Sequence, residues 1–60
     1  MTKQQVVNAL QMDITKLLAE RETAYAEGWH DDDISDINAE LHELEDRLER
    51  AQKRLAKAAS

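Results

Sequence analysis

The side chains best suited to chemistry in this sequence are two histidines and a large set of carboxylates. His42 is followed by Glu43, Glu45 and Asp46, and a histidine with a carboxylate four residues later on a helix can bind a metal ion. Helical metal sites also draw ligands from a second, inward-facing cluster, which the sequence lacks. We therefore expect His42 to be a solvated surface residue, and no metal site.

Catalysis has little support in the sequence. The chain contains no cysteine, no glycine-rich phosphate loop and no serine spaced with His30 or His42 as in a known catalytic triad. We expect a protein that is not an enzyme, that needs no cofactor and that has no small-molecule substrate.

The segment from Trp29 to Asp33 is the most unusual stretch of the chain. Its three consecutive aspartates, Asp31, Asp32 and Asp33, offer oxygen ligands, but the central glycine and closing glutamate of a calcium loop are absent. Helix capping explains these acids better. Trp29 either packs back onto the end of the fold or is an exposed anchor for a partner protein. These four residues are the candidate partner-binding residues.

Charge is distributed unevenly along the chain. The net charge is -5, which argues against general affinity for nucleic acid. Residues 31–49 hold nine acids and a single base, Arg47, whereas residues 50–57 hold four bases and no acid. The acidic stretch resembles a series of phosphates, and the basic residues are candidates for RNA binding: Lys3, Arg50, Lys53, Arg54 and Lys57.

Two helices are predicted to position these residues. Thr2 and Gln5 fit a capping box, so the first helix is expected over residues 3–27. Gly28, the only glycine, is typical of a helix C-terminus. The aspartates that follow predict a turn over 28–32 and a second helix over 33–58, with an aspartate as its N-cap.

Apolar residues recur at alternating spacings of three and four in both segments, which is a heptad pattern. Leu18 and Tyr25 widen the apolar stripe of the first segment. The expected seam between helices or chains comprises Val7, Leu10, Ile14, Leu17, Leu18, Ala24, Tyr25, Ile34, Ile37, Leu41, Leu44, Leu48, Ala51 and Leu55.

Arg21 interrupts the apolar series of the first segment. One interpretation, which we favour here, is that its stem lies along the seam while its charged head reaches water. The alternative is that it is a polar residue that specifies the register of the helices.

The predicted fold is therefore all-α: an antiparallel two-helix hairpin forming a single domain over residues 1–60. A chain this small, without disulfides, is expected to dimerise into a four-helix bundle. Folding collects acids at the turn and bases at the open end, so an antiparallel arrangement of two hairpins places unlike charges together.

No stretch of about 18 apolar residues exists to span a membrane. The N-terminal residues Met1–Gln5 also lack the apolar region of a signal peptide, so a cytoplasmic location is expected.

Several residues are similar to those of one known family. Met1-Thr2-Lys3-Gln4, Ala9, Leu10 and Met12 match in the first helix. The second helix matches at Asp36, Ile37, Leu41, His42, Asp46, Leu48 and Arg50. Through these the chain resembles the Rop (Rom) plasmid copy-number regulators. The resemblance implies an antiparallel dimer of helical hairpins that binds paired RNA loops through the first helix. Of the family's RNA-contacting residues only Lys3 is matched, and the chain contains no Phe.

Three functions follow as hypotheses. The first is a homodimeric interaction module that regulates or inhibits a partner protein, of the kind carried by mobile elements. The second is a Rop-like RNA-binding regulator that uses the basic open end. The third is an acidic decoy whose residues 31–49 occupy a site for nucleic acid on its target.

Overall fold

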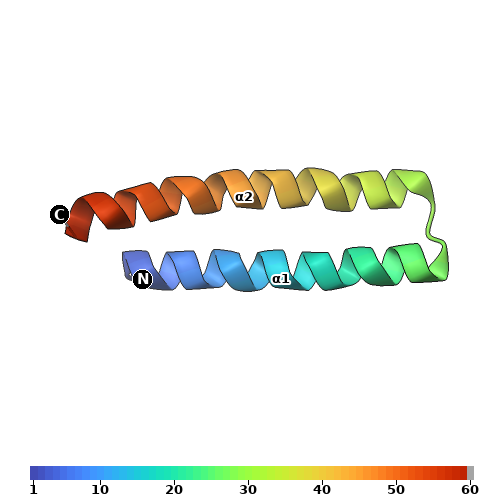
Figure 1. Ribbon diagram of the computed structural model, residues 1–60, viewed down its shortest axis with the longest axis horizontal. Helices are drawn as coiled ribbons and strands as arrows, with labels where there is room; N and C mark the ends of the chain where they lie inside the picture. Colours follow the sequence, from blue (N-terminus) through green and yellow to red (C-terminus); the bar gives the residue numbers. More distant parts are fainter. Residues whose placement is uncertain (60) are drawn as a thin grey trace.

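The computed structural model describes residues 1–59 and consists of two α-helices (Figure 1). Helix α1 spans Lys3–Glu27 and helix α2 spans Asp31–Ala59. They lie side by side and antiparallel, so the start of α1 and the end of α2 lie at the same, open end of the hairpin, opposite the turn. The predicted all-α hairpin is confirmed, and the bounds of the first helix agree with those expected from the sequence.

Helix α1 begins with the expected capping box. The backbone N–H of Gln5 donates to the Thr2 hydroxyl oxygen at 3.1 Å, and the backbone N–H of Thr2 donates to the Gln5 side-chain carbonyl at 2.8 Å. Two backbone donors that no helical carbonyl can reach are thereby satisfied.

Helix α1 ends at Gly28, which adopts the left-handed conformation with φ +71°. The Gly28 N–H donates to the Tyr25 carbonyl at 3.4 Å, and the Trp29 N–H donates to the Ala24 carbonyl at 2.9 Å. This pair of bonds defines a Schellman motif. The motif turns the chain sharply after Gly28, as the single glycine predicted.

Helix α2 begins two residues earlier than predicted, and its N-cap is a histidine. The His30 carbonyl accepts the Asp33 and Ile34 N–H groups at 3.0 and 3.2 Å, and its ring Nδ1 accepts the Asp32 N–H at 3.2 Å. The prediction of an aspartate N-cap and a start at residue 33 was wrong. Asp31, Asp32 and Asp33 instead form the first turn, where their charges face the positive end of the helix dipole.

The core between the helices is small. Among the described residues only Val7, Ala24, Ile37 and Leu41 are buried. Three of them form one cluster near the turn, against which further apolar side chains pack: Ile14, Leu17 and Ile34. The remaining residues of the predicted seam are half-buried, apart from Leu18 and Tyr25, which the hairpin leaves exposed.

The hairpin is elongated for its mass. It measures 46 × 15 × 14 Å and has a radius of gyration of 14.0 Å, against about 10 Å for a compact domain of this length. Its accessible surface is 4654 Å², whereas a compact monomer of the same mass exposes about 4000 Å². One hairpin therefore exposes about 650 Å² more surface than a compact domain of this mass.

Candidate functional site

A hydrogen bond between polar side chains links the two helices. The Arg21 guanidinium donates to the Asn38 side-chain oxygen at 3.1 Å, and both side chains are half-buried. Of the two interpretations of Arg21, this bond favours a role in fixing the register of the helices over a head that simply reaches water. The sequence analysis did not identify Asn38. A polar residue within an apolar series needs a hydrogen-bond partner, and a polar residue level with it on the opposite helix could have been sought for that reason.

Two exposed apolar residues flank Arg21 on the surface of α1. Leu18 lies three residues before it and is 38% exposed, and Tyr25 lies four residues after it and is 61% exposed. Residues at these spacings share one side of a helix. Leu18, Arg21 and Tyr25 thus form a continuous patch, with Asn38 of α2 beside it.

The hairpin has two broad faces, one on each side of the seam, and their compositions differ. Residues seven apart lie on the same side of a helix. We name as the neutral face the two series that contain Leu18 and Asn38: Gln4, Gln11, Leu18, Tyr25, Asp31, Asn38, Glu45 and Gln52. We name as the charged face the series that contain Glu20 and Asp33: Val6, Asp13, Glu20, Glu27, Asp33, Glu40, Arg47 and Arg54.

Grooves on the surface confirm that the charged face is continuous across both helices. One groove near the turn joins Glu20 of α1 to Asp33 and Glu40 of α2. A second groove near the open end joins Val6 of α1 to Arg47 and Arg54 of α2. The charged face is therefore acidic towards the turn and basic towards the open end.

Trp29 lies at the turn end of the charged face. Its side chain is 37% exposed, its indole N–H donates to the Glu27 carboxylate at 2.8 Å, and it lines the same groove as Glu20 and Asp33. Trp29 is thus partly packed against the end of the hairpin and partly accessible. The neighbouring aspartates Asp31, Asp32 and Asp33 are exposed in the first turn of α2.

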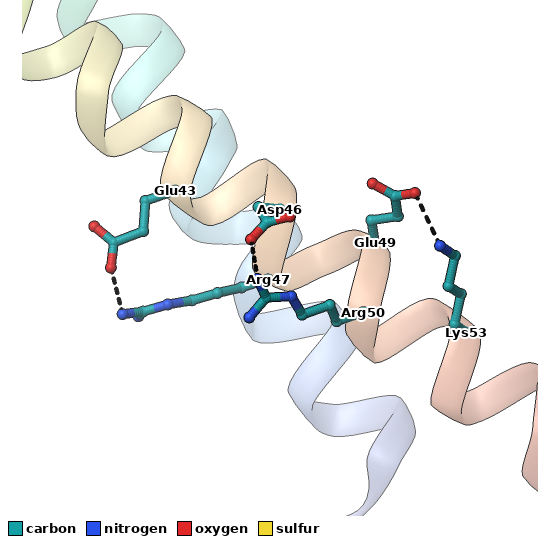
Figure 2. Close-up of polar contacts among 6 residues, drawn as sticks. All are labelled: Glu43, Asp46, Arg47, Glu49, Arg50 and Lys53. Atoms are coloured by element: carbon teal, nitrogen blue, oxygen red, sulfur yellow. Dashed lines mark hydrogen bonds and ion pairs between the residues drawn. The ribbon is translucent and has the colours of Figure 1, made fainter.

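The basic residues of the open end are exposed, but several are paired along α2. Figure 2 shows Arg50 with Asp46 at 2.7 Å, Lys53 with Glu49 at 3.2 Å, and Arg47 with Glu43 at 2.5 Å. The two residues of each pair are four apart in the sequence, and all six side chains are exposed on α2. Lys3, Arg54 and Lys57 lie exposed at the same end. Each pair partly neutralises a base that RNA phosphates would have to recruit.

The two histidines lie apart from each other. His30 caps α2, and His42 lies exposed on its outer surface. Within residues 1–59, the structure brings no three histidine, cysteine or acidic side chains into an arrangement that could hold a metal ion.

Comparison with known proteins gives no match to a family model, to a curated protein or to a solved structure. Neither helix of the described chain is both long and apolar enough to cross a bilayer.

Proposed function

We propose that this chain is a non-enzymatic interaction module that works as a homodimer of hairpins and regulates or inhibits a partner protein. The observation that supports self-association is the surface left open by one hairpin, about 650 Å² more than a compact monomer of its mass exposes. Most seam residues, such as Leu44, Leu48 and Leu55, are only half-buried against the opposite helix.

The dimensions of the hairpin suit a dimer. A broad face of 46 by 15 Å has a projected area of about 700 Å², close to the ~800 Å² that each partner contributes to a standard interface. Covering one face would bury the half-exposed leucines and isoleucines of both helices at once, as in a four-helix bundle.

Sedimentation equilibrium at micromolar concentration tests the dimer. We expect a mass twice that of the 6.9 kDa chain. A monomer that unfolds cooperatively at the same concentration would contradict the proposal, because it would show that one hairpin is stable with its seam half-open.

The turn end supports the choice of a protein partner. Trp29 lies in a groove with acidic side chains on both helices, so an aromatic surface and negative charge meet at one accessible place. Aromatic residues are enriched where binding energy concentrates. By contrast, Arg50 and Lys53 of the open end are paired with acids of their own helix, which lowers their attraction for RNA.

A pull-down from the native host, with and without nuclease treatment, would identify the partner class. We expect a protein that is retained after nuclease treatment and that binds a Trp29→Ala variant more weakly by roughly 2 kcal/mol. Met12→Ala is a suitable control, because Met12 is exposed on the outer side of α1, remote from the turn. Loss of the captured partner on nuclease treatment would favour an RNA-dependent function instead.

A further inference from the structure

The groove near the turn is lined by acidic side chains of both helices. Its lining residues on α2 recur at spacings of three and four, so they share one side of that helix. Glu20 contributes an acid from α1, and Trp29 contributes an aromatic ring from the turn. We name as the turn groove the surface formed by these side chains: Glu20, Trp29, Asp33, Asp36, Ile37 and Glu40. Its carboxylates thus lie beside a buried isoleucine and a partly exposed indole.

The side chains of the turn groove can accept hydrogen bonds from a ligand but have none to donate. An ionised carboxylate is only an acceptor. The single N–H donor among these side chains belongs to the indole of Trp29, and it is already donated to the Glu27 carboxylate at 2.8 Å. Trp29 therefore offers a ligand its aromatic surface and no donor. A complementary ligand has to bring both N–H donors and positive charge.

The carboxylates of the turn groove also lack a partner within the hairpin. Among residues 1–59, no side chain forms an ion pair or a hydrogen bond with any of the four. Further along α2, the acids Glu43, Asp46 and Glu49 each pair with a base four residues later. Asp36 instead has Glu40 at that spacing, where two like charges repel each other. A cationic ligand would neutralise this repulsion.

We propose that the turn groove binds an arginine-rich segment of the partner protein, with one guanidinium stacked on the Trp29 ring and hydrogen-bonded to the carboxylates around it. Arginine suits the groove better than lysine, because its planar guanidinium carries five N–H donors and stacks on aromatic rings. The cation–π contact and the attraction of the carboxylates then act on the same group. The inference rests on the proposed interaction module and adds the chemistry of the segment that it recognises.

The spacing of the acids suits a peptide better than a metal ion. Asp33 and Glu40 are seven residues apart, which is about 10 Å along the axis of α2. Two arginines separated by one residue of an extended peptide lie on the same side of it, about 7 Å apart. Within residues 1–59, no three acidic side chains are close enough to hold one metal ion. The carboxylates are therefore spread over the length of a short peptide.

The basic residues of a second copy are the competing occupant of the turn groove. Arg47, Arg50 and Lys53 already pair with acids of their own helix, so docking them in the groove would break ion pairs that the hairpin has made. Exchanging one exposed ion pair for another brings little net gain. The structure therefore favours a cation from outside the chain.

The fluorescence of Trp29, the only tryptophan of the chain, tests binding directly. The probe is a blocked peptide of alternating glycine and arginine that contains two arginines. The control is the same peptide with citrulline, which has the shape of arginine without its charge. We expect a saturable change of emission with the arginine peptide, and a dissociation constant at least about tenfold higher for the citrulline peptide. Equal dissociation constants, or no binding of either peptide, would overturn the inference.

Two matched double variants test the site. Glu20→Gln combined with Glu40→Gln removes one carboxylate of the turn groove from each helix, and is expected to raise the dissociation constant of the arginine peptide at least about tenfold. Glu22→Gln combined with Glu45→Gln removes the same charge from exposed positions of the same helices outside the groove. We expect this control to change the constant by no more than about threefold. Equal losses in the two would show that net charge alone attracts the peptide, and would overturn the inference.

Sedimentation of the Glu20→Gln, Glu40→Gln variant separates this inference from the proposed homodimer. We expect the variant to dimerise as the wild type does. A dimer lost in this variant alone would show that the groove holds the second copy, against the inference. A wild-type dimer that captures a protein but does not bind the arginine peptide overturns the inference and leaves the proposed function standing. A wild-type monomer that binds the peptide supports the turn groove and overturns the proposed homodimer.

Discussion

At the scale of single residues, the conformation of Gly28 and the bond between Arg21 and Asn38 fix the geometry of the hairpin. Gly28 supplies the left-handed backbone that closes α1. Arg21 of α1 donates a hydrogen bond to Asn38 of α2, so these two residues lie level with each other in the hairpin. The structure leaves no buried side-chain nitrogen or oxygen of the described residues without a partner.

Gly28→Ala is expected to destabilise the protein by about 1 kcal/mol, because an L side chain disfavours φ +71°. No atom lies within 4 Å of the position that the new methyl group would take, so the cost is conformational and not steric. Chemical denaturation measures the loss. Gly28→Asn is the control, since asparagine tolerates the left-handed region better, and a loss as large as that of alanine would contradict the explanation.

A double-mutant cycle tests the link between the helices. Asn38→Ala leaves the half-buried guanidinium of Arg21 without its acceptor and is expected to cost about 1 kcal/mol. Arg21→Leu combined with Asn38→Leu is expected to restore or raise the stability, because the pair is replaced by apolar contact. Strictly additive effects on the free energy of unfolding would show that the two side chains act independently.

At the scale of the elements, the two helices are stabilised by different means. Helix α1 is held at its ends, by the capping box at Thr2 and the Schellman motif at Gly28. Helix α2 combines an acidic first turn with exposed ion pairs along its outer side. Such pairs contribute only a few tenths of a kcal/mol each and weaken in salt. The continuous apolar series of α2 therefore contributes more than its charges do.

Thr2→Ala is expected to lower the stability by about 1 kcal/mol, since the Gln5 N–H loses its acceptor. Thr23→Ala is the matched control. Thr23 lies within α1 and its hydroxyl donates to the Ala19 carbonyl of the same helix, so alanine there is expected to be neutral or slightly stabilising. Thermal unfolding followed by circular dichroism compares the two, and similar melting temperatures would contradict the capping argument.

At the scale of the whole molecule, the elongated shape of the hairpin limits how much apolar surface it can bury. A rod 46 Å long and about 15 Å across has little interior, and only four described residues are buried in it. Stability in so small a chain normally requires a second source of burial. The proposed second hairpin would supply this burial by covering a broad face of the first.

The melting temperature is expected to rise with protein concentration, because unfolding of a dimer is coupled to dissociation. Calorimetry over a hundredfold range of concentration measures the dependence. A melting temperature independent of concentration, in a range where sedimentation shows a monomer, would contradict the dimer at the level of folding.

Local signals in the sequence determined most of the fold. The capping box, the single glycine and the heptad spacing act within one or two turns of a helix, so they placed α1 at its observed bounds and predicted the hairpin. The start of α2 was the exception, because three consecutive aspartates offered several equivalent N-caps. The path of the chain after Gly28 determines where α2 begins. It places His30 so that its carbonyl and ring nitrogen accept the first free N–H groups of the helix.

The candidate surfaces depended on the tertiary structure. The sequence by itself determined which residues line each side of each helix, since that follows from 3.6 residues per turn. It could not determine which residues of α1 lie level with which residues of α2, because that register depends on contacts between residues far apart in the chain. The bond from Arg21 to Asn38 and the exposure of Leu18 and Tyr25 are such outcomes, and they separate a neutral face from a charged one.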